Sequence, residues 1–252
     1  FSGLKFPTMV AILSFFVHPE TVLWVGGKIF VSDIGEFNKR DGKVYVKRGR
    51  NWEVYASYLN DPKGLAYCKG VLYVADVDRI WAVKDKSAVF LLVGPKDFKA
   101  EFLNGITCYK GEKLYVSDTY GNAIYEVDIN TKSVKKVLGV EKPNGLTLDI
   151  SGNLYIITFT KPGRILRWDG KKIDTLLVSE DINGGDGIVY DEESRSIIAS
   201  GFESGNVIQL TPDGKYVVIA KGLTTPAGIG FDGKTVYIPL LEKGKVINKR
   251  IR

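Results

Sequence analysis

The chain is poor in the side chains that most often bind transition metals or act as catalytic bases. It contains one histidine, His18, one methionine, Met9, and two cysteines, Cys68 and Cys108. A single histidine excludes a histidine-rich metal site, and no serine is spaced to form a catalytic pair with it. Neither a Cys-x-x-Cys motif nor an Asn-x-Ser/Thr sequon is present. Few thermolabile residues among many charged ones predict a thermophilic source.

Long hydrophobic runs are also absent. The apolar stretch at residues 6–17 is too short to span a bilayer, so no membrane span is expected. The chain starts at Phe1. Residues 6–17 have two interpretations: the tail of a signal peptide, or a strand that pairs elsewhere in the fold. We favour the strand. A cytoplasmic location is slightly favoured, with a processed or secreted form as the alternative.

Positive charge is in excess but is not clustered. The net charge is +6 and the pI is about 9.1, yet the lysines are spread along the chain among acidic residues. Residues 243–252 alternate apolar and charged side chains, as an outer strand would. We therefore expect no nucleic-acid partner. A small-molecule substrate and a monomer are expected instead, although the sequence does not give the oligomeric state.

A short pattern recurs along the whole chain at spacings of 43, 41, 40, 42 and 41 residues. Each copy places an apolar residue two and four positions after its key residue, which is strand patterning. A fixed period of this length indicates a repeat architecture. The key residues, here called the ring positions, are Glu20, Lys63, Asn104, Asn144, Asp186 and Ala227.

The repeats predict an all-β fold, a six-bladed β-propeller with four-stranded blades. The blades start near residues 19, 62, 103, 143, 185 and 226 and form one domain over residues 1–252. The sixth repeat is one strand short, and residues 6–17 are predicted to complete it and close the ring. Cys108 lies at an inner apolar position and Cys68 next to one, so we expect buried free thiols rather than a disulfide.

One motif match is rejected by its context, and one further set of residues is interpreted as structural. Residues 228–235 match the phosphate-loop pattern, but a strand hairpin follows where that motif requires a helix. Asp33, Asp76 and Asp118 end the second strands of the first three blades. We interpret these three as turn caps rather than as catalytic groups.

The ring positions are the strongest functional signal. The first strands of a propeller line its channel, so these six side chains converge on one mouth. Glu20, Asn104, Asn144 and Asp186 offer only oxygen ligands, which suits a hard divalent cation. We expect Ca²⁺ first, with Mg²⁺, Mn²⁺ or Zn²⁺ as alternatives. The competing interpretation is that Asn and Asp before Gly merely favour turns.

These motifs resemble those of the SMP-30/gluconolactonase/lactonase family of six-bladed propellers. Pro143-Asn144-Gly145-Leu146 matches the family's Pro-Asn-Gly-Leu directly, and Asp186-Gly187-Ile188 is similar to its Pro-Asp-Gly-Met. The segments at Glu20 and Asn104 are similar to its Glu-Gly-Pro-x-Trp and Asn-Asp-Gly. The resemblance implies a metal-dependent hydrolase of lactones or esters. All four residues would bind the metal, and Asp186 would also be the general base.

Two departures point to the substrate. Phe102 stands where the family has a sugar-binding arginine, and Gly105 replaces an aspartate. A more apolar substrate than a sugar lactone is therefore expected, with Phe102 and Lys63 as substrate-binding residues. Lys63 has a second interpretation, in which it pairs with Glu20 and no metal binds. The alternative function is a non-catalytic NHL- or YncE-like binding propeller, and a metal-free strictosidine-synthase-like protein is a third option.

Overall fold

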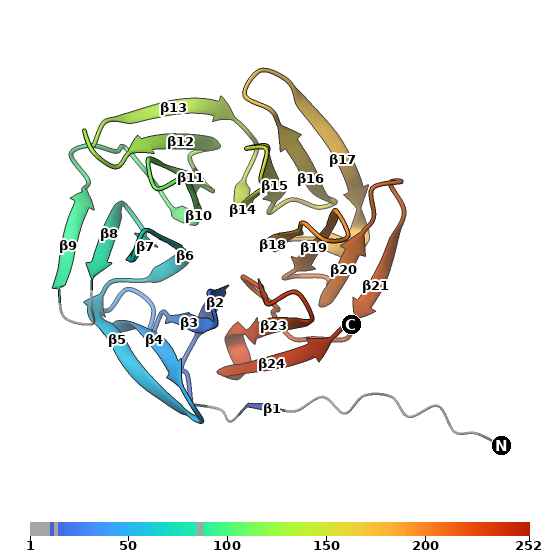
Figure 1. The fold of residues 1–252 in the computed structure, drawn as a ribbon, viewed down its shortest axis with the longest axis horizontal. Coiled ribbons are helices and arrows are strands. Elements are labelled where there is room, and N and C mark those ends of the chain that lie inside the picture. The colour runs from blue at the N-terminus through green and yellow to red at the C-terminus, as the bar shows by residue number, and fades with distance from the viewer. Residues whose placement is uncertain (1–10, 13–14, 85–87) are drawn as a thin grey trace.

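In the computed structural model, six four-stranded antiparallel sheets form a ring around a central channel (Figure 1). The structure describes residues 11–12, 15–84 and 88–252. Each sheet is a blade whose first strand faces the channel and whose last strand lies on the outer rim. The predicted fold class, a six-bladed β-propeller, is confirmed.

The first three blades follow one another along the chain. Blade one consists of β2 (Pro19–Val25), β3 (Lys28–Asp33), β4 (Gly42–Arg48) and β5 (Asn51–Leu59). Blade two consists of β6 (Pro62–Cys68), β7 (Val71–Asp76), β8 (Arg79–Lys84) and β9 (Ala88–Val93). Blade three consists of β10 (Leu103–Tyr109), β11 (Lys113–Asp118), β12 (Ala123–Asp128) and β13 (Val134–Gly139).

The remaining blades complete the ring. Blade four consists of β14 (Pro143–Leu148), β15 (Leu154–Thr158), β16 (Gly163–Trp168) and β17 (Ile173–Ser179). Blade five consists of β18 (Gly185–Asp191), β19 (Ser196–Gly201), β20 (Asn206–Leu210) and β21 (Tyr216–Ala220). Blade six contains β22 (Gly230–Phe231), β23 (Thr235–Leu240) and β24 (Lys245–Arg250). Short 3-10 helices span Glu180–Ile182 and Leu241–Lys243.

A strand from the start of the chain closes the ring. β1 (Ala11–Ile12) pairs antiparallel with β24 as the outer strand of blade six, with Ala11 opposite Ile247. The predicted closure by an N-terminal strand is confirmed for these two residues. Residues 6–10 and 13–14 of the predicted closing segment lie outside the described residues. Phe16 is buried, and its ring packs edge-on against Trp52 of blade one at 5.3 Å.

The apolar core lies between the blades. Phe30 and Val44 of blade one pack with Leu65, Leu72 and Val74 of blade two in one buried cluster. Similar clusters join blade two to three and blade four to five. Removing such side chains from water contributes about 1.5–3 kcal/mol each. The blades are therefore held together by the inward-facing residues that the strand patterning predicted.

Five of the six inner strands carry an irregularity at the ring position. The pairing register shifts between Pro19 and Thr21 in β2, and equivalent shifts occur in β6, β10, β14 and β18. A bulge leaves a residue out of the ladder and re-aims its side chain. The ring residue lies within each bulge, which explains why its side chain turns into the channel.

The glycine that follows a ring residue allows neighbouring inner strands to approach closely. A Cβ atom on Gly105 would lie 2.2 Å from the carbonyl oxygen of Asn144, and one on Gly64 would lie 2.3 Å from that of Asn104. Neither distance leaves room for a methyl group. Glycine is thus required here by packing between blades.

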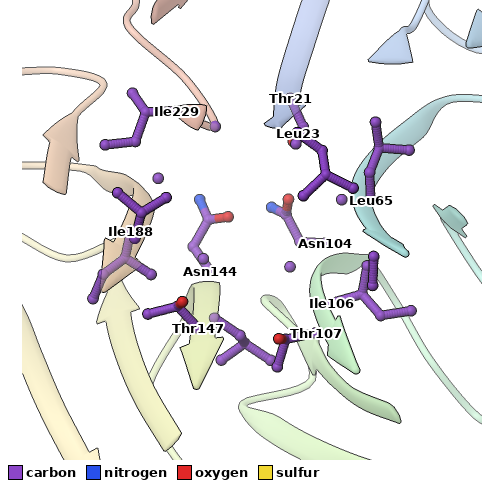
Figure 2. A pocket seen from close by; sticks show the side chains of 18 of the residues that line it. Thr21, Leu23, Leu65, Asn104, Ile106, Thr107, Asn144, Thr147, Ile188 and Ile229 are labelled. Atoms are coloured by element: carbon purple, nitrogen blue, oxygen red, sulfur yellow. The ribbon is translucent and has the colours of Figure 1, made fainter. Parts of the chain in front are cut away.

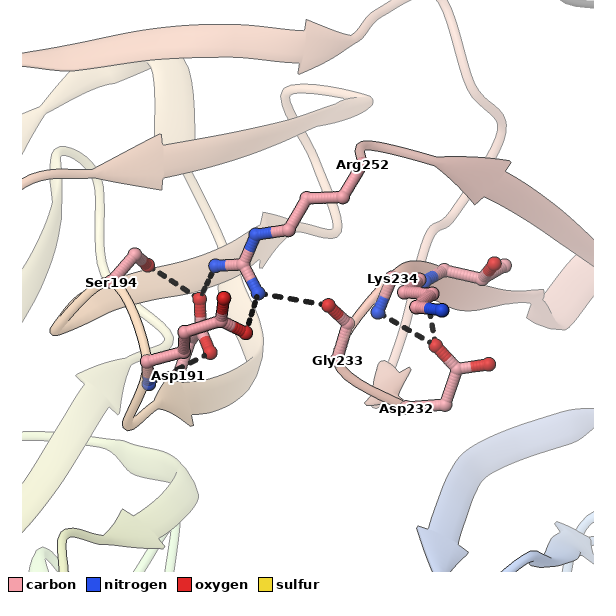
Figure 3. Close-up of polar contacts among 8 residues, drawn as sticks. Asp191, Ser194, Asp232, Gly233, Lys234 and Arg252 are labelled. Carbon is pink, nitrogen blue, oxygen red and sulfur yellow. Dashed lines mark hydrogen bonds and ion pairs between the residues drawn. The ribbon is translucent and has the colours of Figure 1, made fainter.

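The end of the chain also ties two blades together. Arg252 forms an ion pair with the buried Asp191 of blade five (Figure 3). Its guanidinium also donates hydrogen bonds to Glu193 at 3.1 Å and to the carbonyl of Gly233 at 2.8 Å. Asp191 accepts a further bond from the Ser194 hydroxyl. We refer to this contact as the blade 5–6 latch.

The cysteine prediction was wrong. Cys68 and Cys108 form a disulfide, with their Cα atoms 6.4 Å apart. They lie in the inner strands β6 and β10 of neighbouring blades, which run side by side along the channel. The sequence placed each cysteine at or beside an inner position but did not give the offset between the two strands, which decides whether the sulfur atoms meet.

Candidate functional site

The oxygen-bearing ring residues meet in the central channel. Glu20, Asn104, Asn144 and Asp186 line two cavities, one on each side of the ring that they form. The channel cavity, of about 200 Å³, continues between the inner strands past Thr107. Figure 2 shows the side-chain amides of Asn104 and Asn144 projecting into this channel. The structure brings together the four oxygen-bearing residues among the six ring positions.

The cavity on the other side, the mouth cavity, has aromatic walls. Its volume is about 210 Å³. The walls are formed by Phe37, Phe102, Tyr120, Phe159 and Phe202, each from a different blade or loop. The rings of Phe102 and Tyr120 lie 4.9 Å apart, and His18 packs against Phe37 at 4.5 Å. The mouth cavity therefore combines an apolar wall with a polar floor.

The three aspartates that end second strands are caps, as predicted. Asp118 accepts hydrogen bonds from the backbone N–H groups of Glu101 and Phe102, at 3.0 and 2.8 Å. Asp33 and Asp76 accept equivalent bonds just before β2 and β6. Each aspartate thus fixes the turn that leads into an inner strand of its own blade. The turn before β10 carries Phe102, and the turn before β6 carries Asp61, whose carbonyl accepts a hydrogen bond from Lys63.

Hydroxyl groups join ring residues across blades. Ser117 accepts a hydrogen bond from the N–H of Gly105 at 2.9 Å and donates one to the carbonyl of Asn144 at 2.7 Å. Ser32 and Ser200 bridge their own inner strand to the next ring position in the same way. Blades one, three and five are therefore each hydrogen-bonded to the following blade at the level of the ring.

Side-chain hydrogen bonds orient the two asparagines. Asn104 donates through Nδ2 to the Thr119 hydroxyl at 3.2 Å, and Thr119 donates to the carbonyl of Pro143 at 2.8 Å. Asn144 donates through Nδ2 to the carbonyl of Gly185 at 3.2 Å. Within the described residues, neither amide oxygen accepts a hydrogen bond. Both oxygens are free to serve as ligands.

The two ring carboxyl groups are held in an unfavourable environment for charge. Burial raises the pKa of Asp186 well above its ordinary value, and the negative charge of Glu20 raises it further. Burial also raises the pKa of Glu20, opposed by a 2.6 Å hydrogen bond from the Thr21 hydroxyl and by the charge of Lys63. In the described part of the chain, no group donates a hydrogen bond to the Asp186 carboxyl. A cation in this ring would relieve that cost.

Lys63 occupies the floor of the mouth cavity and is only 4% exposed. Its ammonium donates to the backbone carbonyl of Asp61 at 3.1 Å and lies 4.2 Å from the centre of the Phe102 ring. Burial lowers the pKa of Lys63, while the carboxylates of Glu20, Asp61 and Asp76 oppose that shift. Among the described residues, Lys63 and Glu20 form no ion pair, so the predicted direct pairing is not observed.

The donor set fits a hard cation in its chemistry. Two carboxylates and two amide oxygens, without nitrogen or sulfur ligands, are what Ca²⁺ prefers. No cluster of three or more His, Cys, Asp or Glu side chains suited to a metal exists in the part of the chain that the structure describes. The ring would therefore depend on its two asparagines to complete a coordination shell.

Several residues of the site were not found from the sequence. The bridging hydroxyls of Ser32, Ser117 and Ser200 and the aromatic walls from Phe37, Tyr120, Phe159 and Phe202 are in this class. The serines share one place in three second strands, and this periodic placement was a usable signal. The aromatic residues also share a place: Tyr120, Phe159 and Phe202 lie in four-residue loops between the second and third strands of their blades, and Phe37 lies in the longer equivalent loop of blade one. This shared place was a second usable signal.

The fold and site define a six-bladed β-propeller with a polar ring at the floor of an apolar mouth. No family model and no curated protein matches the chain. Among solved structures, a nidogen/laminin complex matches with a TM-score of 0.77 and 17% identity over 89% of this chain and 90% of that chain. A proposed gluconolactonase matches with a TM-score of 0.74 and 16% identity, covering 96% and 91% of the two chains.

A further match is a streptogramin B lyase, with a TM-score of 0.68 and 15% identity over 96% of each chain. At these identities the likeness concerns the fold. Membership of the SMP-30 family therefore stays a prediction. Among the described residues, no helix has the length and apolar character needed to cross a bilayer.

Proposed function

We propose that this protein is a metal-dependent hydrolase that opens lactones or related esters in its mouth cavity. One observation carries the proposal: four bulged inner strands direct only oxygen ligands into one buried ring, at the floor of a cavity large enough for a small ligand. The two carboxyl groups of this ring are buried without a salt-bridge partner within the described residues. Such an arrangement is costly in a protein that binds no cation.

Glu20, Asn104, Asn144 and Asp186 would hold the ion, Ca²⁺ before Mg²⁺, Mn²⁺ or Zn²⁺. A bound divalent cation would polarise the ester carbonyl and favour the ionised form of both carboxyl groups. Asp186 would then accept a proton from the attacking water at its carboxylate oxygen. The aromatic walls would exclude bulk water, and Phe102 and Lys63 would contact the substrate. An apolar lactone suits these walls better than a sugar lactone.

The ion is tested by thermal unfolding after EDTA treatment, followed by addition of Ca²⁺, Mn²⁺ or Zn²⁺. An ion that binds only the folded protein stabilises it by about 2.7 kcal/mol at one hundred times its dissociation constant. We expect wild type and Asn130→Ala, an exposed hairpin control, to show this shift. Asn144→Ala should lose it. Absence of a shift with every ion would contradict the metal site.

The hydrolysis is tested with a series of lactones that differ in their apolar part. Asp186→Ala should reduce turnover by at least about a hundredfold, since a general base contributes a factor of this order or more. The circular dichroism spectrum should stay that of the folded protein. Unchanged hydrolysis by Asp186→Ala would refute the role of Asp186, and no hydrolysis of any lactone by wild type would refute the proposed reaction.

A second candidate is a non-catalytic binding propeller without metal. The position of Lys63 favours it, because a lysine at a ring position lies close enough to Glu20 for its charge to oppose the raised pKa of that carboxyl. In this case EDTA and added ions leave the unfolding temperature unchanged, and no lactone is hydrolysed. The same two measurements therefore separate the candidates.

A further inference from the structure

A buried primary amine opens onto the mouth cavity. Lys63 differs from an exposed lysine such as Lys136, because it is 4% exposed and lines the aromatic-walled mouth cavity. Burying an ammonium without a carboxylate in direct contact is costly. Metal binding does not explain why Lys63 is buried, since all the proposed metal ligands are oxygen atoms of other residues.

The contacts of the nitrogen fit a neutral amine. One N–H donates to the carbonyl oxygen of Asp61 at 3.1 Å, and the nitrogen lies 4.2 Å from the centre of the Phe102 ring, where a second N–H can point at the π face. In the part of the chain that the structure describes, no donor is directed at the nitrogen. The lone pair of a neutral Lys63 amine is therefore not engaged by another group.

The surroundings favour that neutral form. The aromatic side chains of the mouth cavity, among them Phe102 and Phe159, keep the amine away from bulk water. Burial lowers the pKa of Lys63, and this is the largest influence on it, ahead of the opposing carboxylates of Glu20, Asp61 and Asp76. Desolvation in an apolar pocket is one of the ways in which proteins turn a lysine into a nucleophile.

We propose that Lys63 captures carbonyl compounds, namely aldehydes or unhindered ketones with an aromatic or other apolar body, as a reversible Schiff base in the mouth cavity. The polar end of the ligand would reach the amine while its apolar body packs on the aromatic walls. This activity requires neither a metal nor hydrolysis, so it stands or falls separately from the proposed function.

The reaction balances without an oxidant or a reductant. The Lys63 nitrogen forms a bond to the carbonyl carbon, and a proton passes from nitrogen to the former carbonyl oxygen to give a carbinolamine. The carbon–oxygen bond then breaks, the second proton leaves the nitrogen, and the oxygen departs as water into the mouth cavity. The product is an imine, and addition of water reverses the sequence.

Reductive trapping tests the proposal on the intact folded protein. Benzaldehyde is added at neutral pH with cyanoborohydride, which converts the imine to a stable benzylamine, and peptides are quantified by mass spectrometry at short times. We expect Lys63 to be labelled several-fold faster than the exposed Lys136, because a lowered pKa leaves a larger share of the Lys63 amine unprotonated at neutral pH. Labelling of Lys63 no faster than that of Lys136 would overturn the proposal.

Three comparisons separate a built site from general lysine reactivity. Protein unfolded in urea should lose the preference for Lys63, since the preference arises from the cavity. Lys63→Arg, which keeps the positive charge but has no primary amine, should lose the fast phase and retain the slow labelling of exposed lysines. Glyoxylate, a small charged aldehyde without an apolar body, should label Lys63 more slowly than benzaldehyde does. Retained preference in urea, or faster labelling by glyoxylate, would contradict capture in the mouth cavity.

Discussion

At the scale of single residues, the site is defined by charges that the fold buries without direct partners. Asp186 receives no hydrogen bond within the described residues, and Glu20 receives one from Thr21. The folded protein therefore stabilises the protonated form of Asp186 relative to the unfolded chain. This difference makes stability depend on pH in a direction that can be worked out.

A group whose pKa is raised on folding contributes stability that is fully present below its unfolded pKa. That stability is lost as the pH rises through the folded pKa. For Asp186 the window begins near pH 4 and extends upward, since burial and Glu20 raise its pKa. Asp186→Asn removes the titration. In EDTA, the variant should gain in unfolding temperature over wild type as the pH rises across this window.

Each kcal/mol by which ionised Asp186 destabilises wild type should raise the unfolding temperature of the variant over that of wild type by about 2–4 °C in a chain of this size. Thermal unfolding between pH 4 and 8 measures it. Asp213→Asn is the control, because the pKa of the exposed Asp213 is lowered by the Thr211 hydroxyl and the Lys215 N–H and so shifts the other way. A difference between Asp186→Asn and wild type that stays constant with pH would show that Asp186 is not buried as a charge.

The sequence predicted the identity of the ring residues because every repeat marks the same place. Glu20, Asn104, Asn144 and Asp186 all reach the channel, and Phe102 and Lys63 line the mouth cavity. What sequence spacing did not reveal is the contact made by Lys63, whose amine meets Asp61 and Phe102 rather than Glu20. Side-chain direction depends on the bulge and on neighbouring loops, which spacing does not encode.

At the scale of strands, the repeated glycine after the ring residue is a packing device. The sequence suggested a turn preference for Asn-Gly, but Gly105 lies within β10, where its missing side chain admits the backbone of Asn144. The strand boundaries follow the predicted pattern of alternating apolar residues. Glycine is required here because two blades approach closely, and the distance between blades is fixed only in the closed ring.

Gly105→Ala should therefore destabilise the protein strongly. The added Cβ would lie 2.2 Å from the carbonyl oxygen of Asn144, and relief requires β10 and β14 to move apart. Overpacking of this kind costs about 1–3 kcal/mol. The matched control is Gly139→Ala in the outer strand β13, where no atom lies within 4 Å of the new Cβ. Equal free energies of unfolding in urea for the two variants would contradict close packing at the channel.

At the scale of the whole molecule, two contacts made by distant parts of the chain hold the last blade in place. One is the pairing of β1 with β24, and the other is the latch from Arg252 to Asp191 across blades five and six. The sequence predicted the first from a missing strand in the sixth repeat. It gave no sign of the second, because Asp191 and Arg252 meet only when the last blade docks on its neighbour.

Arg252→Ala should lower the free energy of unfolding by about 1–2 kcal/mol, since Asp191 is buried and Arg252 is partly exposed. Glu193→Ala removes the exposed partner of the same guanidinium and should cost less than about 0.5 kcal/mol. Urea unfolding of both variants measures the difference. If Glu193→Ala lowered the free energy of unfolding more than Arg252→Ala does, the buried Arg252–Asp191 pair would not be the main stabilising part of the blade 5–6 latch.

The pairing of β1 with β24 also sets an order of events during protein synthesis. β1 emerges from the ribosome long before its partner strand, which is translated only after the other five blades. The nascent chain thus carries an unpaired strand through almost the whole of translation, and the ring closes only when the last blade has been made. Exposed strand edges promote aggregation, so newly made chains of this protein should depend on chaperones that shield such edges until closure.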